Sequence, residues 1–520
     1  MAGKPPRVVR NVLWNWTHYG FKIAVAFYIT PLLIERLGDT PYGLWILLSS
    51  ILGYYGLLNF GIDSAVVHLI SKHLAEDRRQ EIARVISTSR FVFRAIAIGI
   101  LFLSLGFAAA FAYSELVFEN IFNVSEELRN PFALLLVILS LGLAGSFLAR
   151  VFVGILRATE RYDLLNSIEI VMLVARTLAI VFLMGDSLLA LGCIFALSGI
   201  LTALADWVAA WKAYPPITDT STSPSFDTAT FRSIRQFGIY SFLNLLTDQV
   251  RFYTDSLVIG QFMQIRFITY YNLAAVLITY FRHFIGHAAS PLFPVFSRYH
   301  GANDEEALRR TFLRASKVLA FVAVLAAGNL MGSALPFLRL WVGGVIGSEY
   351  VALSYRVLLI LLLPFTIEMI QSVALNVIYG TGQHHRLTRL NGLEAGANLF
   401  LSIVLVRSYG LLGVALGTGI PLIITHLVFV SRIVCHLAGV ETPRYIGRSI
   451  VLPIVCGFAL GAGQIFLHRS IGTEAYWQLA MVAMGTSLVF AVLMVRLYFS
   501  ETERRLFWEM WTSRRGGRPS

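Results

Sequence analysis

The stretch TDQVRFYTDSLVIG (Thr247–Gly260) lies within an apolar segment, residues 231–261, that is long enough to cross a membrane as a helix. At 100° per residue its charged side chains fall within an arc of roughly 80°, together with two polar residues upstream. These residues are Asp248, Arg251 and Asp255, with Ser241 and Asn244. The other faces are apolar. We therefore expect a membrane helix whose polar stripe faces protein or water rather than lipid.

The composition of the whole chain is typical of a membrane protein. Of its 520 residues, 57% are hydrophobic and 14% are charged, and the mean hydropathy is +0.69. A soluble chain is less apolar than this. Apolar runs of at least ~20 residues recur along the sequence and predict an all-α polytopic membrane protein with about fourteen transmembrane helices. The predicted spans are approximately 11–36, 41–70, 85–114, 131–155, 162–183, 187–212, 231–261, 267–295, 313–335, 351–379, 388–406, 409–431, 446–468 and 475–498.

The distribution of Lys and Arg predicts the orientation of these helices. If the N-terminus is cytoplasmic, the cytoplasmic loops hold most of the 42 basic residues and the opposite loops hold few. Because cytoplasmic loops of membrane proteins carry such an excess, both termini are predicted to be cytoplasmic. The excess also accounts for the net charge of +12, so we expect no nucleic-acid partner. The sequence contains neither a phosphate-binding loop motif nor a cysteine pattern for metal, so we expect no cofactor and no metal.

A long polar connection divides the predicted helices into two sets of six. It is the Pro-, Ser- and Thr-rich stretch Lys212–Thr230, whose composition is typical of a linker. The sequence RYDLLNSIE (Arg161–Glu169) resembles RLTRLNGLE (Arg386–Glu394) in the second set, with Arg, Asn and Glu at matching positions. We therefore predict two pseudo-symmetric six-helix lobes. The predicted boundaries are 1–212 for the N-terminal lobe, 213–230 for the linker, 231–438 for the C-terminal lobe, 439–498 for two additional transmembrane helices and 499–520 for a basic cytoplasmic tail.

The first helix of each predicted lobe carries a polar stripe that contains a cation. In the first lobe the stripe consists of Asn11, Asn15, His18 and Lys22, and Lys22 superposes on Arg251 of the second. A charge at the centre of a membrane costs about 2.5–3.5 kcal/mol on insertion scales, so such a residue is usually functional or paired. We predict a substrate-binding site composed of Lys22, Arg251, Asp255, Asp248, Asn15, Asn244 and His18, with Arg282 and Arg176 as further candidates.

Each candidate also has a structural alternative. Arg251 would pair with an acid of its own helix, and Lys22 would pair with Asp63 or extend its amine to the interface. Arg176 and Arg282 would bridge the lobes or line a cavity. Four acids are expected to be structural hydrogen-bond partners rather than ion-coupling groups: Glu169, Glu394, Asp206 and Glu368.

Four runs of the sequence resemble the polysaccharide-transporter family. They are YGLWILLSSILGYYGLLNFGIDSAVVHLISKHLAE (Tyr42–Glu76), YTDSLVIGQF (Tyr253–Phe262), FLRLWVG (Phe337–Gly343) and NGLEAGANLFLSIVLVRSYGLLGVALGTGIP (Asn391–Pro421). That family contains O-antigen and exopolysaccharide flippases, and its superfamily includes multidrug extruders and the peptidoglycan-precursor flippase. The resemblance implies two six-helix lobes around a central cavity, alternating access, and two C-terminal helices outside this core, in the cytoplasmic (inner) membrane.

The resemblance and the cationic stripes together predict a flippase rather than an enzyme. It would translocate a polyprenyl-diphosphate-linked oligosaccharide, with the cations binding the diphosphate. Its expected partners are this lipid-linked glycan, membrane lipid and other polysaccharide assembly proteins, and the chain is expected to be a monomer. One alternative is a cation-coupled multidrug or lipid exporter, which would favour an acid-rich cavity. Another is a glycan polymerase or ligase, but the largest predicted outer loop, Glu115–Asn130, lacks a catalytic cluster.

Overall fold

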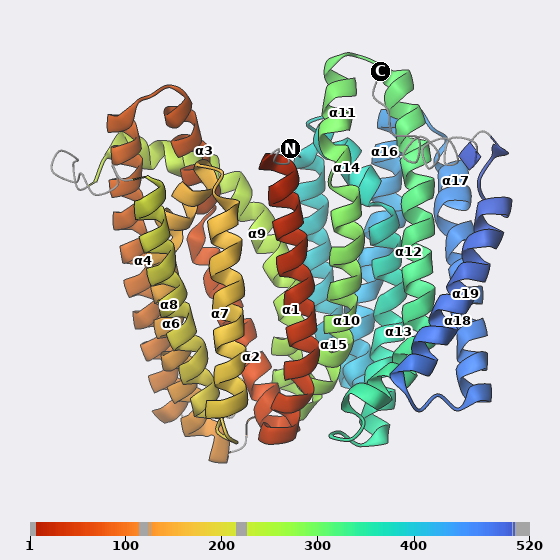
Figure 1. Cartoon of the computed structure of the whole chain (residues 1–520), viewed down its shortest axis with the longest axis horizontal. Coiled ribbons are helices and arrows are strands. Elements are labelled where there is room, and N and C mark those ends of the chain that lie inside the picture. The colour runs from red at the N-terminus through yellow and green to blue at the C-terminus, as the bar shows by residue number, and fades with distance from the viewer. Residues whose placement is uncertain (1–6, 114–123, 125, 215–225, 502, 505–520) are drawn as a thin grey trace, which may run out of the picture. The chain divides into compact units, whose positions relative to one another are not determined.

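The computed structural model describes residues 7–113, 124, 126–214, 226–501, 503 and 504 of the chain. Every secondary-structure element in these ranges is a helix (Figure 1), which confirms the predicted all-α class. The chain folds into two compact units. The first comprises Met1–Asn272 with Leu399–Val414, and the second comprises Leu273–Asn398 with Ala415–Ser520. The predicted lobes divide the chain differently, at the 213–230 linker, and stay a prediction.

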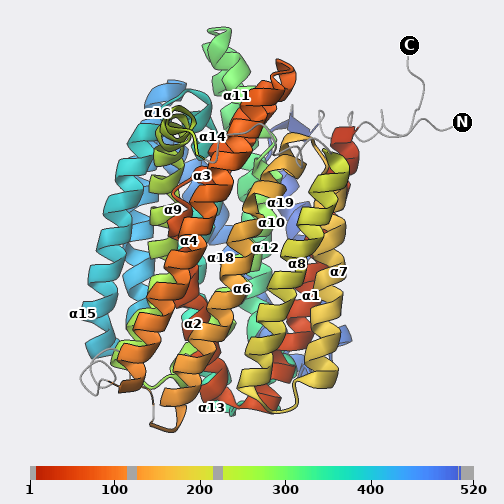
Figure 2. The ribbon, with the colours of Figure 1, turned by 90° about the vertical axis from the view of Figure 1, so that its left-hand side faces the viewer.

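The first unit is a set of long helices packed around apolar side chains. Its elements are α1 (Arg7–Leu37), α2 (Asp39–Tyr55), η1 (Gly56–Asn59), α3 (Ile62–Ala75), α4 (Arg79–Tyr113), α6 (Glu126–Ala158), α7 (Tyr162–Leu183), α8 (Leu188–Ala213), α9 (Thr228–Phe262), the start of α10 (Arg266–Ala289) and part of α15 (His384–Ile424). Helices α4, α6 and α8 lie side by side (Figures 1 and 2). Gly142 of α6 permits the close approach of α8, because a Cβ on it would lie 2.7 Å from the Cα of Ala196.

The predicted span 41–70 is not one continuous helix. Helix α2 ends at Tyr55, a 3₁₀ turn follows, and Phe60 and Gly61 adopt left-handed φ angles of 47° and 72° before α3 begins. The amide of Asp63 at the start of α3 donates a hydrogen bond of 3.3 Å to the side chain of Asn59. The break therefore has its own local hydrogen bond, and the sequence N-F-G at 59–61 was the signal for it.

The second unit contains the remaining helices. They are the rest of α10, α11 (Leu292–Gly301), α12 (Glu305–Val342), α13 (Ser348–Ile370), α14 (Ser372–Gly380), the rest of α15, η4 (Thr425–Val430), α16 (Ser431–Ala438), α17 (Thr442–Tyr445), η5 (Ile446–Val451), α18 (Leu452–Ile471) and α19 (Tyr476–Leu497). Helix α18 is attached to its neighbours by polar bonds as well as glycine contacts. The buried amide of Gln464 donates to Asn329 of α12 and Thr486 of α19, at 2.9 and 2.7 Å.

Ten helical segments in the described residues are long and apolar enough to cross a membrane. One of them, His385–Ala438, covers two predicted spans, and the non-helical Gly410 lies near the start of the second. Three other predicted spans fold as α1, α9 and α10, which are more polar and are not among the ten. A helical multi-span protein is thus confirmed, and the count of about fourteen stays a prediction.

Candidate functional site

The two predicted stripes are only partly visible in the structure. The side chains of five predicted site residues lie outside its described part: Asn15, His18, Asn244, Asp248 and Arg251. The other four predicted residues, Lys22, Asp255, Arg176 and Arg282, are described, and each has a different environment.

Lys22 of α1 is exposed, and it makes no ion pair or hydrogen bond with the residues that the structure describes. Asp63, an alternative partner for it, forms an ion pair with Arg150 of α6 instead. The Arg150 guanidinium also lies over the ring of Phe147, 4.4 Å from its centroid. Pairing of Lys22 with Asp63 is therefore wrong, because the carboxylate already neutralises another cation.

Arg176 of α7 is a second cation without an acidic partner among the described residues. Its guanidinium lies 4.6 Å from the ring centroid of Phe195 on α8. Phe195 in turn contacts Trp45 of α2 edge-on, with the centroids 4.6 Å apart. The aromatic side chains therefore hold the guanidinium in place by a cation–π contact and leave its positive charge uncompensated.

Hydrogen bonds between α1 and α7 align the two helices and so give the distance between Lys22 and Arg176 along the helix axes. Arg36 at the end of α1 donates to the carbonyl oxygens of Ile180 and Val181, at 3.2 and 3.0 Å. At 1.5 Å per residue, Lys22 lies about 21 Å along α1 from Arg36, and Arg176 lies about 6 Å along α7 from Ile180. Because the two helices run in the same direction, the cations differ in depth by about 15 Å. Lys22 also falls within about 40° of Arg36 around α1, on the side that meets α7.

Asp255 is buried, with 7% of its surface exposed, and it accepts a hydrogen bond from the hydroxyl of Tyr271. Its neighbour Thr254 bonds the hydroxyl of Tyr54 on α2 at 2.6 Å. The end of α9 is thus fixed beside the break between α2 and α3. These contacts favour a positioning role for Asp255, and its predicted contact with substrate stays a prediction. Interrupted helices are typical of transporter binding sites.

Arg282 of α10 forms a bidentate ion pair in the second unit. Its Nε and a terminal nitrogen donate to the two carboxylate oxygens of Glu368, at 3.0 and 3.2 Å. The guanidinium also lies 5.0 Å from the ring centroid of Phe365. The Glu368 side chain is 5% exposed and that of Arg282 is 18% exposed. Glu368 is thus a hydrogen-bond partner of Arg282, and Arg282 is a neutralised cation in this structure; a purely structural role for Glu368 stays a prediction.

Two groups that shape this region were missed at the level of sequence. Arg150 lies within the predicted span 131–155, and as a lone charge in an apolar run it was a usable signal. Tyr271, the hydrogen-bond partner of Asp255, gave no such signal, because its role depends on the packing of α10 against α9.

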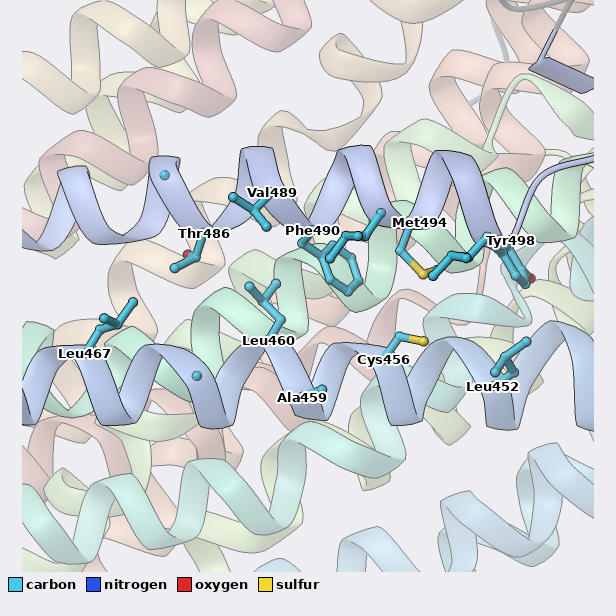
Figure 3. A pocket seen from close by; sticks show the side chains of 14 residues that line it. Leu452, Cys456, Ala459, Leu460, Leu467, Thr486, Val489, Phe490, Met494 and Tyr498 are labelled. Carbon is cyan, nitrogen blue, oxygen red and sulfur yellow. The ribbon is translucent and has the colours of Figure 1, made fainter.

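An apolar cavity of about 580 Å³ lies between α18 and α19, and we refer to it as the α18–α19 groove. Side chains of both helices point toward each other across it, among them Leu460, Phe490 and Met494 (Figure 3). At one end the groove is bounded by Leu452 and Tyr498 (Figure 3). Its lining suits a hydrocarbon chain and offers almost no group to a polar ligand.

Comparison with known proteins decides the family. Residues 8–300 match the family described as "Polysaccharide biosynthesis protein". The chain belongs to this family. A relative in Bacillus subtilis, "Uncharacterized membrane protein EpsK", is 21% identical over 506 residues, which cover 95% of this chain and 96% of that protein. The "Putative O-antigen transporter" of Shigella flexneri is 23% identical over 430 residues, 81% of this chain and 96% of that protein.

The fold of the chain is similar to that of a solved flippase. The "Lipid II flippase MurJ, inward closed conformation" matches with a TM-score of 0.70 and 16% identity, over 93% of this chain and 99% of that one. The predicted family and the predicted helical transporter fold are both confirmed. With ten apolar helices long enough to span a membrane, the chain is a multi-pass membrane protein.

Proposed function

We propose that this protein is a flippase that translocates a polyprenyl-diphosphate-linked oligosaccharide across the cytoplasmic membrane by alternating access. The proposal is supported by Lys22 and Arg176, two cations of predicted membrane spans that make no ion pair with the described residues, in a chain that belongs to this family. The Shigella relative is named a putative O-antigen transporter, and the similar solved structure is a lipid II flippase.

The chemical problem is to carry a diphosphate through a region where charge is costly. Charge-assisted hydrogen bonds from Lys or Arg compensate for the lost hydration of the phosphates. Lys22 and Arg176 differ in depth by about 15 Å, half the thickness of the hydrocarbon core. They would therefore contact the head group at successive depths while the polyprenyl chain stays in lipid. Arg251 on α9 is proposed as a third contact.

Asp255 would position this site from α9, since Tyr271 already occupies its carboxylate. Arg282 would act on substrate only after release from Glu368, so we propose a lesser role for it. Asn15, His18, Asn244 and Asp248 would complete the polar surface. The acids Asp63, Asp255 and Glu368 are all engaged by protein groups, which argues against a binding site for cationic drugs.

The further predictions on partners and placement belong to the same proposal. The protein would reside in the inner membrane with both termini cytoplasmic, and it would act as a monomeric transporter rather than an enzyme. Its partners would be the lipid-linked glycan, membrane lipid and other polysaccharide assembly proteins. Rocking of one predicted lobe against the other would move the site between the two sides.

The test uses purified protein in liposomes and a fluorescent polyprenyl-diphosphate oligosaccharide, with export of surface polysaccharide as the cellular readout. Lys22→Ala and Arg176→Ala should each reduce translocation roughly 10- to 150-fold, the equivalent of one charge-assisted hydrogen bond. Lys22→Arg should retain part of the activity, because the charge remains.

Arg90→Ala is the matched control: Arg90 also lies over an aromatic ring, 5.3 Å from the centroid of Phe152, but it is near the start of the predicted span 85–114 and is not in the proposed site. Its translocation rate should be unchanged. Full activity of a Lys22→Ala, Arg176→Ala double variant, with normal insertion, would disprove the proposed site.

A further inference from the structure

A strongly basic pocket of about 480 Å³ lies at one end of the second unit. It is formed by the start of α12, the connection from α16 to α17, η5 and the segment after α19. Helices α11, α16 and α17 lie at this same end (Figure 1). We call it the basic pocket, and its basic residues are Arg309, Arg310, Arg314, Lys317, Arg444 and Arg448.

Most of the positive charge in the basic pocket is not neutralised by the described residues. Lys317 donates to Glu503 at 2.9 Å, and Arg310 lies 3.6 Å from Glu306. The other four arginines make no ion pair among the residues that the structure describes, and Glu441 is the one further acid in the lining. Several guanidinium groups that converge on one cavity repel each other, so the pocket favours an anion.

Hydrogen bonds to Glu503 hold one wall of the basic pocket in place. Burial of this carboxyl raises its pKa, but hydrogen bonds from Lys317 and Ser500 outweigh that effect, so the pKa of Glu503 is lowered. Its carboxylate is thus ionised and committed to Lys317, and it does not neutralise the arginines opposite. The floor of the pocket includes Tyr445 and Ser449, which are 1% and 3% exposed.

The basic pocket adjoins the α18–α19 groove. Arg448 lies one helical turn before Leu452, and Tyr498 lies close enough to Tyr445 and Glu503, which line the basic pocket, to interact with them electrostatically. Leu452 and Tyr498 bound one end of the groove (Figure 3). From Leu452 to Leu467 the groove follows α18 for about 22 Å, more than the depth of one bilayer leaflet. A cationic cavity therefore lies next to an apolar groove in the second unit.

We propose that the basic pocket and the α18–α19 groove together bind one anionic phospholipid. Its phosphodiester accepts hydrogen bonds from the arginines, and one acyl chain lies between α18 and α19. Arginine matches phosphate geometry through paired donors, and basic pockets between transmembrane helices bind anionic lipid head groups. A soluble phosphate would leave the groove unused, and a zwitterionic lipid would gain less from the uncompensated arginines. None of the residues of this lipid site belongs to the proposed flippase site.

The test measures thermal unfolding of the full-length protein in detergent, with phosphatidylglycerol or phosphatidylcholine of identical acyl chains added. Phosphatidylglycerol should raise the melting temperature at lower concentration than phosphatidylcholine. The variant Arg314→Gln, Arg444→Gln, Arg448→Gln removes three of the cations. The phosphatidylglycerol concentration that gives half of the full rise in melting temperature should then increase on the order of 100-fold, about fivefold per cation. The corresponding triple Lys variant should keep the preference, which separates loss of charge from loss of fold.

Two controls make the result specific. An Arg232→Gln, Arg235→Gln, Arg389→Gln variant removes three exposed arginines outside the pocket and should bind phosphatidylglycerol normally. An equal loss there would overturn the proposal in favour of non-specific surface charge. The second control is inorganic pyrophosphate in place of the lipid. If it alone gives the full rise in melting temperature, the site binds a soluble anion and the lipid assignment is wrong.

The acyl chain is tested by filling the groove. Gly463 and Gly485 line it, and a Cβ added to either meets no atom within 4 Å, so leucine there should be tolerated by the backbone. Gly463→Leu, Gly485→Leu should weaken phosphatidylglycerol binding at least tenfold. Gly99→Leu on α4, where a Cβ also meets no atom, is the control and should have no effect. An unchanged affinity of the double variant would refute the assignment of one lipid to both cavities.

Discussion

The ion pair between Arg282 and Glu368 allows structural and transport roles to be separated. Arg282→Gln removes the bidentate partner of a carboxylate whose side chain is 5% exposed. Glu368→Gln leaves a guanidinium that is 18% exposed and still lies over Phe365. Because the carboxylate is more deeply buried, and because the guanidinium keeps its cation–π contact when Glu368 is replaced, we expect Arg282→Gln to be the more destabilising change.

The magnitude follows from the geometry. Breaking a buried ion pair by removing one partner costs about 3–5 kcal/mol, which is roughly two to four orders of magnitude in the unfolding equilibrium. For Glu368→Gln we expect about 1–2 kcal/mol, since the remaining cation keeps its cation–π contact and some solvent access. Replacing both residues by apolar ones, Arg282→Met with Glu368→Leu, should restore most of the stability, because no charge then stays buried.

The assay is chemical unfolding in detergent, with translocation measured on the same preparations. The exposed pair Arg310–Glu306, at 62% and 75% exposure, is the control, and Glu306→Gln should change stability by less than about 0.5 kcal/mol. Additive losses in the double variant would refute the ion-pair reasoning. If the double variant regains both stability and translocation, Arg282 is structural; if it regains stability alone, Arg282 contacts substrate.

Three further predictions concern other parts of the chain. Gly53→Ala should destabilise the protein by about 1–3 kcal/mol, because the added Cβ would lie 2.7 Å from the Tyr253 ring, and Tyr253→Leu should relieve much of this loss in a thermal-unfolding cycle. The lowered pKa of Glu503 means that it stabilises the fold above its unfolded-state pKa and that this contribution is lost as the pH falls through its folded-state pKa. Acid unfolding of Glu503→Gln should therefore be less pH-dependent in that window than acid unfolding of the unchanged protein. In a background without the native cysteines, Thr222→Cys should resist an impermeant thiol reagent added to intact cells, and labelling from outside would contradict the predicted topology.

The candidate site shows how far the sequence could be followed. Lys22 and Arg176 were identifiable as intramembrane cations, since a charge in an apolar run is visible without any structure. Their lack of an acidic partner was not visible, because it depends on which helix faces them. Asp63 was an equally good sequence candidate to pair with Lys22, and only the packing of α3 against α6 assigned it to Arg150.

The sequence by itself determined the helical membrane class and the family, because transfer of an apolar run into lipid is a sum over neighbouring residues and needs no tertiary contact. Tertiary structure decided which charges are neutralised: Arg282 meets Glu368 across 86 positions of sequence. It also created the basic pocket, whose arginines at 314 and 448 lie on different helices of the second unit. Which acid pairs with which cation depends on how helices that are distant in the chain pack together. Local sequence patterns do not determine that packing.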